Sequence, residues 1–222
     1  MDKYEVALNI RNNKYDLNAQ QRFRKDISGI RFDLSNTNLG GALLDHTDLK
    51  GLNLKGANLG GASIAEANLS KAYLRGANMG GANFSYTNLS DSDMQTANLG
   101  SANLAYAVLN GTDARGANMS GTYFGYASLK GTNLSDAYMW GAYFKGCDLT
   151  GANLENAYLR GADLKGATIK SVKMSGADLS GANVRGAKVG RNCIMALIKS
   201  YKGEIKGAEV KSFVKHDGII LV

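Results

Sequence analysis

The chain has no proline, and it has only two cysteines and two histidines among its 222 residues. Proline removes a backbone donor from a sheet, so its complete absence suggests that backbone hydrogen bonding is needed almost everywhere. The two cysteines, Cys147 and Cys193, do not make a disulfide framework. With His46 early in the chain and His216 in its tail, a Ser-His-Asp or Cys-His site is hard to assemble, and no histidine pair is available for zinc.

Membrane, secretory and nucleotide-binding signals are missing as well. No window holds the roughly 18 consecutive apolar residues that a spanning helix needs, and residues 1–13 lack the basic and apolar regions of a signal peptide. A Gly-Lys dipeptide never occurs, which excludes a P-loop of the usual form. We therefore expect a cytosolic protein that is not an enzyme, with no catalytic residues, no metal site and no cofactor.

A five-residue repeat runs without interruption from residue 32 to residue 191, giving thirty-two units. Each unit has a small residue, usually Ala, then mostly Asn or Asp, then a large apolar residue, then a polar residue and often Gly. Only Ala114 breaks the series of large apolar residues. Apolar residues repeat every 3.6 positions in helices and every 2 in strands, so neither element explains the pattern. A period of five needs a chain that turns a corner in every unit.

A second period of twenty residues indicates how many corners close one turn. The sequence Asn-Leu-Gly-Gly-Ala occurs at 38–42 and again at 58–62. The only phenylalanines at the large apolar position, Phe84, Phe124 and Phe144, also differ by multiples of twenty. Four units per coil and eight coils are the simplest interpretation. At the usual spacing of about 4.8 Å between strands, these coils form a rod of roughly 38 Å.

The unit A-[N/D]-[L/F/M]-x-G resembles that of the pentapeptide-repeat family, and the resemblance covers residues 32–191 without an insertion. The resemblance implies an all-β fold, a right-handed quadrilateral β-helix or β-solenoid, and its handedness comes from the resemblance alone. We expect an N-terminal cap over residues 1–31, the repeat β-helix over 32–191 and a C-terminal cap over 192–222. Caps are expected because a solenoid leaves an open coil at each end.

The two ends carry ordinary secondary-structure patterns. Near the N-terminus, Tyr4, Val6, Leu8 and Ile10 alternate with mostly polar residues, which predicts a half-buried strand, followed by a turn or short helix. After the repeats, an amphipathic helix is predicted from Ile194, Leu197, Ile198 and Tyr201. A partial coil or a hairpin around residues 217–218 follows. This segment either covers the last coil or forms a homodimer contact, as C-terminal segments do in several proteins of the family, and both roles are compatible.

Exposed aromatic residues are predicted on two neighbouring faces of the rod. One face carries glycines in its early coils and then Tyr138, Trp140 and Tyr158, whereas the next carries Tyr86, Tyr106, Tyr126, Tyr123 and Tyr143. Stacked tyrosines about 4.8 Å apart can be ladders that stiffen the sheet. They can also form a binding surface, because Tyr and Trp concentrate binding energy. Trp140, the only tryptophan, is the predicted anchor.

Basic residues gather in the late coils. Residues 160–215 hold 12 Lys and Arg against 4 Asp and Glu, and the whole chain has a net charge of +7. The predicted basic patch consists of Lys145, Lys165 and Arg185 in one column and Lys170 and Lys188 on the neighbouring face. It is either a solvated face that limits aggregation near an open end or a site for nucleic acid, an acidic protein or a lipid headgroup.

These features favour a rigid scaffold or interaction module with an unidentified protein partner. Binding of an anionic polymer or a membrane surface through the late coils is the alternative. Quinolone-resistance members of the family protect DNA gyrase by resembling acidic duplex DNA. The resemblance therefore also implies protection of a topoisomerase as a third candidate function. A net charge of +7 has the wrong sign for a mimic of a polyanion, which makes that third function the least favoured.

Overall fold

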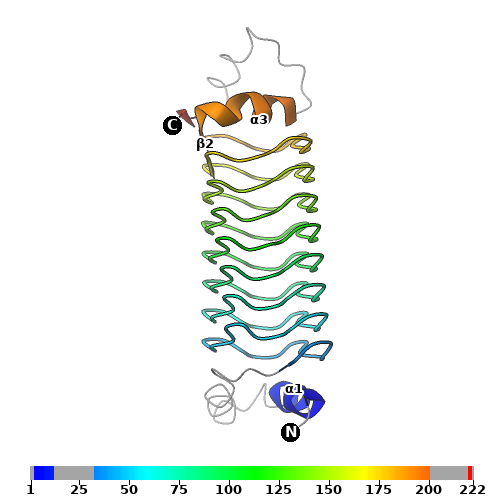
Figure 1. Ribbon diagram of the computed structural model, residues 1–222. Helices are drawn as coiled ribbons and strands as arrows, with labels where there is room; N and C mark the ends of the chain where they lie inside the picture. Colours follow the sequence, from blue (N-terminus) through cyan, green and yellow to red (C-terminus); the bar gives the residue numbers. More distant parts are fainter. Residues whose placement is uncertain (1–2, 13–32, 201–219, 222) are drawn as a thin grey trace.

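The computed structural model describes residues 3–12, 33–200 and 220–221. Most of this chain winds into a rod, with helix α1 (Lys3–Asn12) below the first coil and helix α3 (Ile194–Ser200) above the last (Figure 1). The other elements are the strands β1 (Thr168–Ile169), β2 (Lys188–Val189) and β3 (Ile220–Leu221) and the 3-10 helix η2 (Arg191–Cys193). None of the helices described is long and apolar enough to span a bilayer.

Parallel bridges join each coil to the next with a constant offset of twenty residues, from Asp33–Asn53 to Asp163–Asn183. The same offset continues where Thr168 of β1 pairs with Lys188 of β2. Backbone N–H groups donate to carbonyl oxygens of both the following and the preceding coil; for example, Leu34 N donates to Asn53 O at 2.8 Å. The structure thus confirms four five-residue units per coil.

The last residue of each unit turns the corner in a left-handed conformation. From Asn36 to Gly186 all of these residues have positive φ: 18 glycines and 13 residues of other types. Glycine suits this conformation because it has no Cβ atom. A backbone hydrogen bond then closes the turn, as where Ala42 N donates to Leu39 O at 3.0 Å. Left-handed corners and an almost continuous demand for N–H donors together explain the abundant glycine and the missing proline.

The third residue of each unit fills the interior. Phe124 and Phe144 stack in one column with ring centroids 4.8 Å apart and planes 8° apart. Small residues lie beside these columns, and the inward threonine hydroxyls keep a hydrogen bond, as where Thr112 Oγ1 donates to Leu89 O at 2.7 Å. The buried Ser92 hydroxyl has no such partner among the described residues. We number the faces 1 to 4 by the first buried central residues 34, 39, 44 and 49, and the coils 1 to 8 in steps of twenty from residue 32.

Cys147 takes one of the small inward positions and is fully buried. Its Sγ donates to Phe124 O at 2.6 Å, in the place where other coils have an inward threonine hydroxyl. Burial raises the pKa of the Cys147 thiol to about 12. The thiolate is the reactive form of cysteine, so we expect this buried thiol to react slowly.

The strand predicted near the N-terminus is wrong, because residues 3–12 form helix α1. Ala7 and Ile10 are buried in the same apolar cluster as the coils, whereas Tyr4 and Leu8 are 57% and 51% exposed. The buried residues are therefore three apart, which is a helical spacing. The alternation that suggested a strand includes two side chains that do not face the core.

The helix predicted after the repeats is present as α3, preceded by η2. Leu197 and Cys193 are buried, and Ile194 packs partly buried against the core, so this end of the described chain covers the last coil. The Ile198 side chain and Tyr201 lie outside the described residues. β3 pairs in parallel with β2 and adds another rung to face 4. The predicted hairpin turn at 217–218 also lies outside them, and the homodimer contact stays a prediction.

Candidate interaction surfaces

Reactive groups do not gather in the part of the chain that the structure describes. Within residues 3–12, 33–200 and 220–221, no three His, Cys, Asp or Glu side chains lie close enough together to hold a metal ion. His46 Nδ1 lies 3.2 Å from Glu66 Oε2, and both side chains are exposed. His216 lies outside the described residues. A hydrogen bond from Arg115 lowers the pKa of Asp113, as in an ordinary surface ion pair.

Face 2 carries the Trp140 patch, which we define as Tyr138, Trp140, Tyr158 and Arg160. Tyr138 and Tyr158 occupy the same position in coils 6 and 7, and their rings stack at 5.0 Å and 3°. Trp140 stands nearly perpendicular to both rings, with centroids 6.0 Å from Tyr138 and 6.4 Å from Tyr158. These two contacts hold the indole in place although its residue is 53% exposed.

A pocket of about 400 Å³ opens in this patch and is lined by Trp140, Tyr158, Arg160 and Asp178. Asp178 accepts a hydrogen bond from Ser180 N at 3.0 Å, which orients its carboxylate. The pocket thus combines an aromatic wall with a guanidinium and a carboxylate. Asp178 was not among the site residues predicted from the sequence, although the period of twenty places it one coil above Tyr158.

Below the patch, the outward residues of face 2 are small or hydrogen-bonded to one another. Asparagine side chains bond one another up the rod, beginning where Asn58 Nδ2 donates to Asn38 Oδ1 at 3.0 Å and continuing to Asn118. The adjacent outward positions in coils 1 to 4 are the glycines 40, 60, 80 and 100. The Trp140 patch therefore begins where small and self-bonded residues give way to large side chains.

Tyr86, Tyr106 and Tyr126 form a tyrosine ladder at the corner between faces 3 and 4. Their ring centroids are 4.8 and 5.4 Å apart, with planes 5° and 14° apart. Tyr126 in turn lies over Gly146, where a Cβ atom would come within 2.7 Å of the ring. Because each ring covers the next, their outer edges are the parts most open to a partner. This packing supports the stiffening role, and a partner can still contact the outer edges of the rings.

Tyr123 and Tyr143 lie on face 3, in coils 5 and 6. Their centroids are 6.0 Å apart with planes tilted by 44°, so they do not continue the parallel stacking. Tyr123 folds over Gly125, where a Cβ atom would be 2.9 Å from the ring. The two tyrosines are 43% and 49% exposed. Face 3 therefore presents five exposed tyrosines with the ladder included.

The predicted basic column is present on face 3, where Lys145, Lys165 and Arg185 are all exposed in coils 6, 7 and 8. None of the three forms an ion pair with a carboxylate in the described part of the chain. Lys170 and Lys188 lie apart from the column, on face 4. Anionic-polymer binding stays a prediction, and loss of duplex DNA binding with rising salt is the measurement that tests it.

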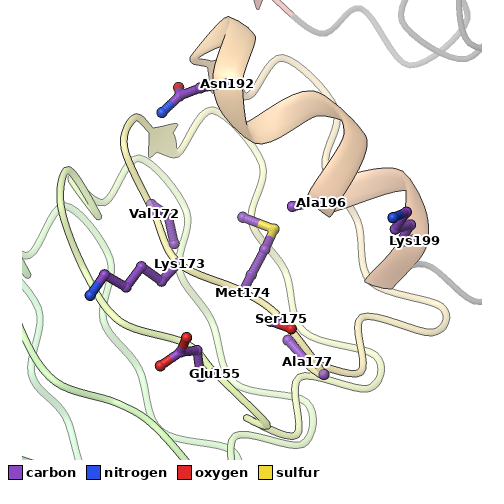
Figure 2. A pocket seen from close by; sticks show the side chains of 10 residues that line it. Glu155, Val172, Lys173, Met174, Ser175, Ala177, Asn192, Ala196 and Lys199 are labelled. Atoms are coloured by element: carbon purple, nitrogen blue, oxygen red, sulfur yellow. The ribbon is translucent and has the colours of Figure 1, made fainter.

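A larger cavity of about 700 Å³ lies between α3 and coil 8 (Figure 2). The buried residues Val172, Met174 and Ala177 line it from the coil, and Ala196 lines it from the helix. Lys173 and Lys199 add charge on opposite sides (Figure 2). The sequence did not predict this cavity, because it depends on where the helix lies over the last coil.

The chain belongs to the pentapeptide-repeat family. The model of that family, described as pentapeptide repeats, matches in eight copies spread over residues 33–125 and 127–186. The fold is accordingly the right-handed quadrilateral β-helix of the family. Proteins of this family are in general structural or interaction modules. No curated protein matches the sequence significantly.

Several solved structures are similar to the chain. The pentapeptide repeat protein Rfr23 from the cyanobacterium Cyanothece 51142 is 30% identical over 51% of this chain and 64% of its own, with a TM-score of 0.34. HetL, involved in heterocyst differentiation regulation in Nostoc sp. strain PCC 7120, is 24% identical over 78% and 96%, with a TM-score of 0.26. QnrB1, a plasmid-mediated fluoroquinolone resistance protein, is 16% identical over 82% and 93%, with a TM-score of 0.45. These TM-scores are low, so the family assignment stands on the repeat match.

Proposed function

We propose that this protein is a non-enzymatic, rigid scaffold that binds a protein partner through the Trp140 patch. The observation that carries the proposal is the indole of Trp140, which two tyrosines hold in place while its residue stays 53% exposed beside a pocket. Energetic hot spots in interfaces are enriched in Trp, Tyr and Arg, and Trp140, Tyr158 and Arg160 meet at this pocket.

The pocket also indicates the chemistry of the partner segment. A carboxylate on the partner can pair with Arg160, and an apolar or aromatic side chain can pack against Trp140 and Tyr158. The surrounding coils supply rigidity, because every coil is hydrogen-bonded to its neighbours through a constant register. A preorganised surface loses little conformational entropy on binding. A short segment that places an aromatic residue on Trp140 and one carboxylate on Arg160, away from Asp178, is therefore the expected ligand.

The test uses the single tryptophan as its own reporter. Partners are captured from a native lysate of the source cells, and the purified partner is then titrated while the fluorescence of Trp140 is followed. We expect an emission shift on binding and at least about a tenfold loss of affinity for Trp140→Ala in a label-free assay.

Tyr73→Ala is the matched control, because Tyr73 is an exposed tyrosine on face 1, 49% accessible and away from the patch. It should retain the affinity of the wild type. Equal affinities of Trp140→Ala and the wild type, with both proteins folded by circular dichroism, would show that the patch is not the binding site.

A further inference from the structure

Face 3 has opposite charges in its two halves. Its units in coils 1 to 4 contain Asp45 and Glu66 and no Lys or Arg, for a formal charge of −2. Its units in coils 5 to 8 contain the basic column, three cations, and a single acid, Asp163, for a formal charge of +2. On none of the other three faces do the two halves carry opposite net charges. Such a face is complementary to itself when turned end over end.

We propose that face 3 binds face 3 of a second copy of this chain in antiparallel orientation. The two-fold axis passes between coils 4 and 5, so that coil 1 faces coil 8 of the other copy and coil 2 faces coil 7. Because the contact is symmetric, each pairing occurs twice. Asp45 then faces Arg185, and Glu66 lies beside Lys165. All four charges of these two pairings find an opposite charge across the interface.

Side-chain size is complementary in the same arrangement. The corner residues of the first coils on face 3 are His46 and Glu66, whereas those of the coils that face them are Gly186 and Gly166. A Cβ atom at either glycine would meet no atom within 4 Å, so there is room for the opposing side chain. Farther inward, Ala65 faces Lys165. At the centre of the arrangement coil 4 faces coil 5, so Tyr106 of each copy lies opposite Tyr126 of the other.

The tyrosine ladder spans coils 3 to 5 and so lies near the two-fold axis, along the corner edge of face 3. Tyr86, Tyr106 and Tyr126 have φ of 59°, 60° and 59° at a corner where later coils have glycine. Five tyrosines on face 3 are between 43% and 58% exposed. Tyrosine is enriched in the buried core of protein interfaces, which an antiparallel dimer would form here.

A second copy fits this face better than an anionic polymer does. A polyanion lying along the rod would meet the basic column at one end and the acids Asp45 and Glu66 at the other. Face 3 is roughly 38 Å long and about 13 Å wide, from eight coils and four residues of strand. That gives about 500 Å² per copy, below the roughly 800 Å² of a standard interface. We therefore expect a dimer that dissociates on dilution and with added salt.

The experiment is a charge exchange between Glu66 and Lys165, followed by sedimentation velocity over a range of concentrations. Glu66→Lys and Lys165→Glu each place like charges together twice per dimer, so each should raise the dimer dissociation constant by about tenfold or more. An equimolar mixture of the two variants should restore dimers, because each altered residue then meets its opposite charge. The double variant Glu66→Lys/Lys165→Glu should also dimerise as the wild type does.

Recovery in the mixture cannot arise from misfolded chains, and circular dichroism of each variant checks the fold independently. Lys173→Glu, an exposed reversal on face 1, is the control and should dimerise normally. The proposal is overturned if the wild type stays monomeric at its highest soluble concentration. It is also overturned if both single variants dimerise like the wild type, as a dimer through the C-terminal segment would, or if mixing them restores nothing.

Discussion

Replacing Phe124 by alanine should destabilise the rod more than any exposed substitution nearby. Phe124 is fully buried in coil 5 and stacks on Phe144 at 4.8 Å. The coils on either side are held at a fixed spacing by ladder hydrogen bonds, so the chain cannot collapse into the space that the ring leaves. Replacing a buried phenylalanine by alanine lowers the free energy of unfolding by about 3–5 kcal/mol. Because the ladder is rigid, we expect the upper end of that range.

The assay is urea denaturation read by two probes. Fluorescence of Trp140 reports coil 6, next to the altered coil, and far-ultraviolet circular dichroism reports the whole rod. In a chain of this length each kcal/mol lowers Tm by about 2–4 °C, so thermal melting should fall by roughly 6–20 °C. Long repeat arrays can lose cooperativity, so the two probes can unfold at different urea concentrations, and that outcome also agrees with the prediction.

Tyr123→Ala supplies the matched control, because Tyr123 precedes Phe124 but is 43% exposed. Its effect should stay within about 1 kcal/mol. If the two variants lose the same stability, the column of central residues does not supply the core of the rod.

Two further predictions concern coil 6. Gly146→Ala should lower the free energy of unfolding and displace Tyr126 in near-ultraviolet circular dichroism, because Gly146 has φ of 70° and its Cβ would press on that ring. Gly166 has φ of 69°, but a Cβ atom there would meet no atom within 4 Å. Gly166→Ala should therefore cost only the backbone strain of about 1–2 kcal/mol and destabilise the rod less than Gly146→Ala. Cys147 should contribute stability that is complete below pH 9 and is lost as pH rises toward 12, since burial raises its thiol pKa from 9.0 to about 12 in the folded chain. A Cys147→Ala variant should therefore show a flatter alkaline stability curve, and an unchanged slope would contradict the burial of the thiol.

The coil was predictable because the rod is built from contacts at one fixed sequence separation. Once four units close a turn, residue i lies beside residue i+20, so Tyr138 and Tyr158, or Lys145 and Lys165, share a column without any knowledge of coordinates. The end segments have no such rule. Residues 3–12 have apolar residues that fit a strand or a helix, and packing of Ala7 and Ile10 on the first coil selects the helix.

The candidate surfaces divide in the same way. The columns of Tyr86, Tyr106 and Tyr126 follow from the period, but their ring stacking does not, because it depends on side-chain rotamers. The same holds for the perpendicular setting of Trp140 and for the pocket that includes Asp178. Sequence spacing gives the outward position of a side chain, whereas the direction of its ring is set by the neighbouring side chains.

By itself, the sequence determined the repeat, the four-sided coil, the buried columns and the faces on which charges and aromatics lie. Those features depend on periodicity, which is visible in the sequence without coordinates. The tertiary structure decided the helix at the N-terminus, the position of α3 over the last coil, the rung that β3 adds and the shape of the Trp140 pocket. These features lie outside the repeat or depend on side-chain directions, so contacts between particular neighbours had to select them.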